Sequence, residues 1–204
     1  ARQILHWFKP DIVIGVGGYA SGPTVRAAWG KNIPTLIQEQ NSYPGITNKL
    51  LGNKVSKICV AYDGMERYFP KDKIVFTGNP VRQDLSFLQD KRKEGFEYFH
   101  LSVHKTVILI LGGSLGAGTI NRSVVKCMQN GIMQLNIQII WQTGKYYYEN
   151  IAADKALDSN PDVHIFGFID RMDLAYTVSD IIISRAGAIA ISELCLAGKP
   201  AILI

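Results

Sequence analysis

Residues 181–193, Ile-Ile-Ile-Ser-Arg-Ala-Gly-Ala-Ile-Ala-Ile-Ser-Glu, decide the fold. The isoleucines at 181–183 predict a buried parallel strand, because a run of β-branched residues without alternation suits a strand covered on both faces. Residues 184–187 then predict a turn of mostly small residues, and residues 188–197 predict a helix that Gly198 ends. A strand, a tight turn and a helix in this order offer backbone N–H groups and the positive end of a helix dipole to a phosphate.

Glu193 lies between one and two turns into that helix. A carboxylate at this distance from the turn is able to accept two hydrogen bonds from a ribose diol while phosphates occupy the turn. The residues alone leave an alternative open, in which the stretch is an ordinary core unit and the glutamate is solvated.

The order of strand, loop and helix recurs along the chain, and such alternation predicts parallel sheets. Further strands are expected at 11–16, 34–39, 57–61, 73–77, 106–111, 137–141, 164–169 and 200–204, and further helices at 24–29, 47–51, 119–128, 146–156 and 172–178. We therefore expect two Rossmann-like halves, residues 1–82 and 103–204, that face a cleft. Residues 83–102 are dense in charge and predict a linker with a helix, whose run Lys91-Arg92-Lys93 lies on a solvated face.

Composition narrows the class of protein. Of 204 residues, 47% are apolar and 19% are charged, which suits a folded core and excludes a disordered chain. The net charge of +5 favours anionic partners, but the charges are scattered, which disfavours nucleic acid. The three cysteines lie far apart and predict reduced, buried thiols. No apolar run approaches the roughly 18 residues that cross a bilayer. Both ends look cut, so we expect an internal piece of a longer protein.

Five stretches at predicted strand ends carry glycine or polar residues: 17–22, 39–41, 78–82, 112–118 and 184–193. One alternative is a nicotinamide-dependent oxidoreductase, because residues 15–20 loosely match G-x-G-x-x-G and Glu39 follows about 20 residues later, where a ribose-binding acid belongs. Two further polar residues and a Pro-Gly loop after Glu39 argue against it. In open α/β sheets, ligands bind beyond the carboxyl ends of the strands.

Taken together and in order, the five stretches resemble the MurG family. These bacterial enzymes transfer N-acetylglucosamine from UDP-N-acetylglucosamine to the C4 hydroxyl of lipid I and form lipid II for peptidoglycan. The resemblance implies the GT-B fold, with the acceptor in the N-terminal domain and the UDP-sugar in the C-terminal one. It also implies a peripheral position on the cytoplasmic face of the membrane. No metal ion, no other cofactor and no nucleic-acid partner are expected.

The resemblance also implies roles for single residues. Glu193 would hold the ribose, Gly187 to Ala190 would face the diphosphate, and Ile169 would contact uracil through its backbone. Ser114 would bond a phosphate, Arg82 would lie at the domain junction, and Asn41 would reach the donor across the cleft. The expected UDP-N-acetylglucosamine contacts are thus Asn41, Arg82, Ser114, Ile169, Gly187, Ala188, Ile189, Ala190 and Glu193. The loop expected to face the acceptor's diphosphate contains Gly17, Gly18, Tyr19, Ser21 and Gly22.

One family feature has no match here. Members of the family carry a further glycine-rich loop ending in a histidine that is taken as the general base. The chain's four histidines, His6, His100, His104 and His164, occupy no such loop, so the catalytic base stays unassigned and we expect this piece alone to bind UDP weakly without transferring sugar. Within the same fold, a UDP-N-acetylglucosamine 2-epimerase and a non-catalytic UDP-sugar-binding module remain alternatives.

Overall fold

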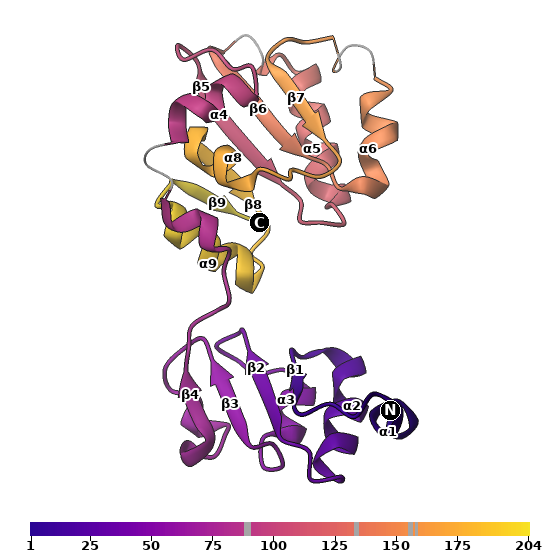
Figure 1. Cartoon of the computed structure of the whole chain (residues 1–204). Helices are drawn as coiled ribbons and strands as arrows, with labels where there is room; N and C mark the ends of the chain where they lie inside the picture. Colours follow the sequence, from indigo (N-terminus) through magenta and orange to yellow (C-terminus); the bar gives the residue numbers. More distant parts are fainter. Residues whose placement is uncertain (88–90, 133–134, 155–156, 158) are drawn as a thin grey trace. The chain divides into compact units, whose positions relative to one another are not determined.

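A computed structural model describes residues 1–87, 91–132, 135–154, 157 and 159–204 of the chain (Figure 1). The chain divides into two compact units, Ala1–Pro80 and Val81–Ile204. Each unit carries one sheet, and every strand pairing in both sheets is parallel. The predicted α/β class with two parallel sheets is therefore confirmed.

The first unit is a four-stranded sheet in the order β1-β2-β3-β4. Its core is centred on Ile37, Ile58 and Val60 of the sheet. Apolar side chains of the helices and connecting segments pack around them. The elements in chain order are α1 (Arg2–Phe8), β1 (Val13–Gly15), α2 (Gly18–Trp29), β2 (Thr35–Glu39), α3 (Ile46–Leu51), β3 (Lys57–Val60), the 3₁₀ turns Met65–Arg67 and Lys71–Lys73, and β4 (Ile74–Phe76).

The second unit is a five-stranded sheet in the order β7-β6-β5-β8-β9. Its described elements are the 3₁₀ turn Gln83–Phe87, α4 (Arg92–Tyr98), β5 (Thr106–Leu111), α5 (Gly118–Gln129), β6 (Ile137–Gln142), α6 (Lys145–Ala152), β7 (Val163–Phe166), α8 (Met172–Val178), β8 (Ile181–Ser184), α9 (Ala188–Ala197) and β9 (Ala201–Leu203). The strand and helix predicted at 181–183 and 188–197 are confirmed, and Gly198 ends α9 with φ of 61°.

Each face of the second sheet has its own core. One face packs against Ile120 and Met128 of α5. The other packs against α8, against Leu194 of α9, and against Phe96 of α4. All seven residues of α8 are buried, so this short helix lies inside the unit. The side chains of β5 alternate between these two cores, which explains its uninterrupted apolar sequence.

The segment that the sequence presents as a linker packs onto the second unit wherever the structure describes it. Gly95 of α4 lies so close to α8 that a Cβ atom there would come within 2.5 Å of Val178. Phe96 and Phe99 are buried in the core of that unit. Residues 91–102 therefore belong structurally to the second unit, together with Leu85, which is also buried there.

The prediction that Lys91, Arg92 and Lys93 share a solvated face is wrong for Lys91, which is half-buried, whereas Arg92 and Lys93 are exposed. Lys91 pairs with Asp173 of α8 at 2.8 Å, and Arg92 pairs with Asp180 at 3.1 Å. Arg92 stays exposed despite this pairing, and Lys93 is the most exposed of the three, facing Glu97 at 3.9 Å. The partners that fix the first two cations lie about 80 residues away in sequence, which a local pattern does not reveal.

Asp173 is the buried centre of this ion-pair group. The Arg171 guanidinium donates to it at 3.0 Å and holds the pKa of its carboxyl well below the usual range, with Lys91 adding to the effect. Burial acts in the opposite direction, but the two cations outweigh it. The side chain is only 4% exposed, so the carboxylate depends on these partners.

Two further predictions need correction. The helix expected to begin near Pro23 begins at Gly18, so residues 18–22 form its first turns and Pro23 lies inside it. A glycine-rich run with a proline predicts a loop, but here Gly17 and Gly18 adopt the left-handed backbone that starts the helix directly. The three cysteines are free thiols, as predicted, but they are not buried: Cys59 is half-buried, and Cys127 and Cys195 are exposed. None of the described helices is long and apolar enough to cross a bilayer.

Candidate functional site

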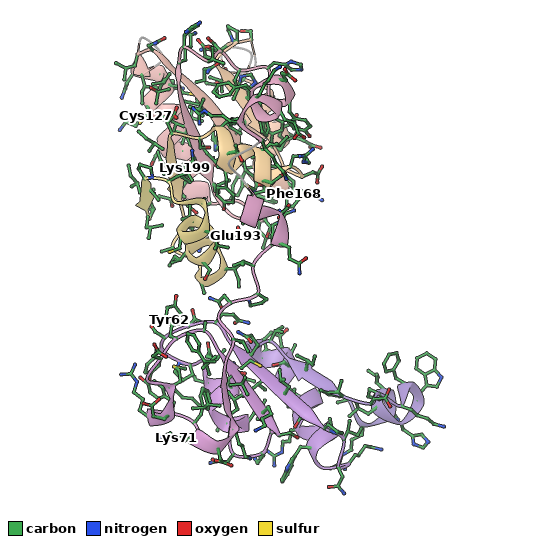
Figure 2. The ribbon with its side chains drawn as sticks, turned by 60° about the vertical axis from the view of Figure 1, so that its left-hand side comes forward. Tyr62, Lys71, Cys127, Phe168, Glu193 and Lys199 are labelled. Atoms are coloured by element: carbon green, nitrogen blue, oxygen red, sulfur yellow. The ribbon has the colours of Figure 1, made fainter. Side chains whose placement is uncertain are left out.

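A hollow of about 650 Å³ opens at the carboxyl edge of the second sheet, where β5, β6 and β8 end. The loops after β5 and β8 form its walls with the first turns of α9, and α8 contributes Met172 and Tyr176. Figure 2 labels Phe168 and Glu193, two of its lining residues, which come from the segment after β7 and from α9. Of the predicted donor contacts, Ser114, Gly187, Ile189, Ala190 and Glu193 line this hollow.

The N-terminus of α9 is uncapped on the hollow's wall. Gly187 is the N-cap residue and no described side chain caps the helix. Its carbonyl accepts the first helical bond from Ile191, so the amides of residues 188–190 precede the first helical donor. Three N–H groups and the helix dipole therefore favour an anion at this edge.

Glu193 reaches the hollow one turn further along α9 and is half-buried. Its Oε2 accepts a hydrogen bond of 3.1 Å from the Tyr176 hydroxyl. Burial raises the pKa of the Tyr176 phenol, and the neighbouring Glu193 charge adds to that rise. The hydroxyl is thus a stable donor, and the carboxylate is held at one oxygen.

The backbone amide of Ile169, the predicted uracil contact, already donates a hydrogen bond within the protein. The Ile169 side chain is buried, and its amide donates to Gln142 Oε1 at 2.9 Å. The Gln142 amide group donates in turn to the Gly113 carbonyl at 3.2 Å. Gln142 therefore ties the loops after β5 and β7 together, and a base that uses the Ile169 amide must first displace this bond.

Four predicted donor contacts lie outside the residues that line the hollow: Ile169, described above, Asn41 in the first unit, Ala188 and Arg82. Ala188 lies at the start of α9 but does not line it. Arg82 is exposed, pairs weakly with Asp84 at 3.8 Å, and donates to the Asp170 carbonyl at 3.5 Å. Arg82 still acts on the site electrostatically, because its charge lowers the pKa of Tyr176 against the larger effect of burial.

A second, smaller hollow of about 240 Å³ lies in the first unit. It is lined by Gly17, Gly18 and Tyr19 of the predicted acceptor loop and by Asn41, which was predicted to reach the donor. Ser21 and Gly22 do not line it: the Ser21 hydroxyl donates back to the Gly18 carbonyl, and Gly22 packs against Thr47 of α3.

Glu39 at the end of β2 is the organising residue of this second hollow. It is 2% exposed and accepts four hydrogen bonds of 2.8–3.1 Å. The donors are the Asn41 amide and side chain, the Gly45 amide and the Asn48 side chain. Because the Asn41 NH₂ group faces Glu39, its Oδ1 is the atom left to accept a bond from a ligand. Four donors around two oxygens account for Glu39 without a nicotinamide ribose.

None of the four histidines lines either hollow. His6, His100 and His104 are exposed, while His164 lies on β7, where burial lowers its pKa. In the ranges given above, no group of three or more His, Cys, Asp or Glu side chains is arranged to hold a metal ion.

Sequence reasoning missed Gln142 and Tyr176. Gln142 carried a weak signal, because it is a polar residue ending the apolar strand β6. Tyr176 carried no sequence signal that distinguishes it from the rest of α8, because every residue of that helix is buried. Together with Arg185, which also lines the hollow, these residues complete a site for an anion beside a carboxylate.

Two Rossmann-like sheets, one with an uncapped helix N-terminus and an acidic residue at its carboxyl edge, are the architecture of the GT-B class, to which many nucleotide-sugar transferases belong. The C-terminal domain of glycosyltransferase family 28 matches residues 107–204, and the N-terminal domain of the same family matches residues 1–60. The chain belongs to glycosyltransferase family 28.

Curated relatives agree with that assignment. The chain is 55% identical over 204 residues to the UDP-N-acetylglucosamine–N-acetylmuramyl-(pentapeptide) pyrophosphoryl-undecaprenol N-acetylglucosamine transferase of Parabacteroides distasonis, covering 100% of this chain and 55% of the relative. The enzyme of the same name from Flavobacterium psychrophilum is 54% identical, over 98% of this chain and 54% of the relative. The chain thus spans about half the length of the curated relatives it matches.

Solved structures support the fold. The crystal structure of Acinetobacter baumannii MurG matches with a TM-score of 0.65 and 32% identity, over 100% of this chain and 55% of that one. A UDP-N-acetylglucosamine 2-epimerase from Rickettsia bellii matches with a TM-score of 0.69 but only 18% identity, over 98% of this chain and 57% of that one. The second match reflects the shared GT-B fold, so fold similarity alone does not separate transferase from epimerase.

Proposed function

We propose that this chain forms the sugar-donor site and part of the acceptor site of an enzyme that transfers N-acetylglucosamine from UDP-N-acetylglucosamine to the C4 hydroxyl of lipid I. The observation that carries the proposal is the hollow at the carboxyl edge of the second sheet, where uncapped N–H groups of α9 lie one turn from Glu193. The identity of 55% to a transferase with this named activity supports the same substrates.

The donor would bind with its diphosphate at the N-terminus of α9 and its ribose at Glu193. As the sugar–phosphate bond breaks, negative charge builds on the leaving UDP, and the helix N-terminus stabilises that charge. Ser114 and Arg185 line the same hollow and would contact the diphosphate or the sugar. Arg82 and Asn41 stay proposed donor contacts, and Ile169 stays a proposed uracil contact once Gln142 releases its amide.

The acceptor would use the first unit. Its diphosphate would face the start of α2, where Gly17, Gly18 and Tyr19 line the smaller hollow. Direct attack of the C4 hydroxyl on the anomeric carbon would invert its configuration, with a general base taking the hydroxyl proton. No histidine lines the described hollows, and we assign the base to no residue of this chain. Lipid I is membrane-bound, so we place the enzyme peripherally on the cytoplasmic face, where the net charge of +5 suits anionic lipids.

A calorimetric series tests the donor half of the proposal. The chain is titrated with UDP, UDP-N-acetylglucosamine and NAD under one set of conditions. We expect binding of both uridine nucleotides and none of NAD. Binding of NAD without UDP would favour the oxidoreductase instead.

A chimera tests transfer itself. Residues 1–204 replace the equivalent residues of the Parabacteroides distasonis transferase, to which they align over their full length. With radiolabelled UDP-N-acetylglucosamine and a lipid I analogue, we expect labelled lipid II. Epimerised sugar formed without an acceptor would contradict the proposal and favour the 2-epimerase.

A further inference from the structure

Tyr176 and Glu193 meet across two helices at the wall of the larger hollow. The Tyr176 side chain is 1% exposed, and its hydroxyl donates to Glu193 Oε2 at 3.1 Å. Both residues line the hollow. The phenol is therefore anchored in the core at its ring and joined to the proposed ribose-binding carboxylate at its oxygen.

The two helices differ in how firmly the core holds them. All seven residues of α8 are buried, whereas Leu194 is the buried residue of α9. The carboxyl end of α8 is also fixed from outside, since Arg92 and Lys199 donate to the Thr177 carbonyl at 3.1 and 3.2 Å. Glu193 thus lies on α9, the less buried helix, and contacts Tyr176 of α8, the fully buried one.

The hydrogen bond has a fixed direction. Burial keeps the Tyr176 phenol protonated, with its pKa raised above the ordinary value, so the hydroxyl donates and Glu193 accepts. One carboxylate oxygen is therefore engaged before a ligand arrives, and Oε1 is the oxygen whose full accepting capacity remains. A glutamate without this contact would lose rotamer freedom only on binding, at a cost of free energy.

We infer that Tyr176 is a positioning residue that holds the Glu193 carboxylate in the orientation that accepts hydrogen bonds from a ribose diol. The inference rests on the proposed UDP site and deepens it. If the hollow prefers nucleotides with ribose hydroxyls, Tyr176 and Glu193 together determine that preference, rather than Glu193 alone. In this role Tyr176 does not contact the substrate itself and acts only through Glu193.

The test compares two ligands and two variants by calorimetry. Tyr176→Phe removes the hydroxyl and keeps the ring, so the core is preserved. We expect the dissociation constant of UDP to rise about tenfold, equivalent to roughly 1.4 kcal/mol. The dissociation constant of 2′,3′-dideoxyuridine diphosphate, which has no diol, should stay within about twofold. Tyr98→Phe is the matched control, because Tyr98 is half-exposed on α4 and outside the hollow.

A double variant adds a second readout. If both residues act on the diol as one unit, Tyr176→Phe combined with Glu193→Gln should bind UDP no more weakly than Glu193→Gln alone. Unchanged UDP binding by Tyr176→Phe would overturn the inference and leave the proposed function standing. Equal loss for UDP and the dideoxy ligand would also overturn it, because Tyr176 would then only shape the hollow. Absence of UDP binding by the unchanged chain would overturn both.

Discussion

Replacing Glu193 by glutamine tests the donor site most directly, because the change keeps size and removes charge. In the structure the carboxylate is half-buried on the hollow's wall and already accepts one bond from Tyr176. A ribose diol would add two charge-assisted bonds. Bonds to charged groups contribute about 1.5–3 kcal/mol and neutral ones about 0.5–1.5 kcal/mol, so each loses roughly 1 kcal/mol. The sum, about 2 kcal/mol, corresponds to a roughly thirtyfold weaker UDP complex.

Isothermal titration of UDP measures this change, with Glu149→Gln as the control, since Glu149 is an exposed carboxylate of α6 in the same unit. The unfolding midpoint of both variants should stay close to that of the unchanged chain. Glu193→Gln binding UDP with an unchanged dissociation constant would refute the reasoning and leave Glu193 as a solvated residue of α9.

Four other substitutions test the framework by denaturant titration. Gly116→Ala should lower the free energy of unfolding by at least about 3 kcal/mol, because φ is +82° and a Cβ would lie 2.1 Å from the Thr143 carbonyl oxygen. Gly113→Ala, with the same φ and nothing within 4 Å, should cost only about 1 kcal/mol. Asp173→Asn should cost about 2 kcal/mol or more at pH 7, and the difference should shrink below about pH 4, because a carboxyl with a lowered folded pKa loses its contribution as pH falls. Glu39→Gln should destabilise the first unit by about 2 kcal/mol or more, since its NH₂ group would face N–H donors. A loss below about 0.5 kcal/mol in Asp173→Asn or Glu39→Gln, or equal losses in the two glycine variants, would contradict these accounts.

The sequence was sufficient for the sheets because their strands are short, mostly apolar segments between glycine and polar turns. The run 106–111 and the isoleucines from 181 onward are apolar and rich in β-branched residues, which favours strands buried on both faces of a parallel sheet. The site edge followed from the same pattern, since parallel strands bring their carboxyl ends to one side. The sequence alone therefore predicts Ser114 and Glu193 on one edge, where both line the hollow.

What the sequence left undetermined depends on contacts distant along the chain. The pairings of Lys91 with Asp173 and of Arg92 with Asp180 are examples. The same holds for Gln142, whose side chain donates to the Gly113 carbonyl and accepts from the Ile169 amide. Such pairings have no periodicity or spacing that a local pattern can carry.

The packing of α4 on α8 has a practical consequence for anyone who divides this protein. A shortened chain starting at residue 103 would follow the sequence pattern but would remove Leu85, Phe96 and Phe99 from the core they share with α8. The uncovered face of α8 would then be an exposed apolar surface. Such a product would be prone to aggregate during expression. Cleavage between Pro80 and Val81 instead keeps this core intact, so a protease cut there should release residues 81–204 as one folded piece.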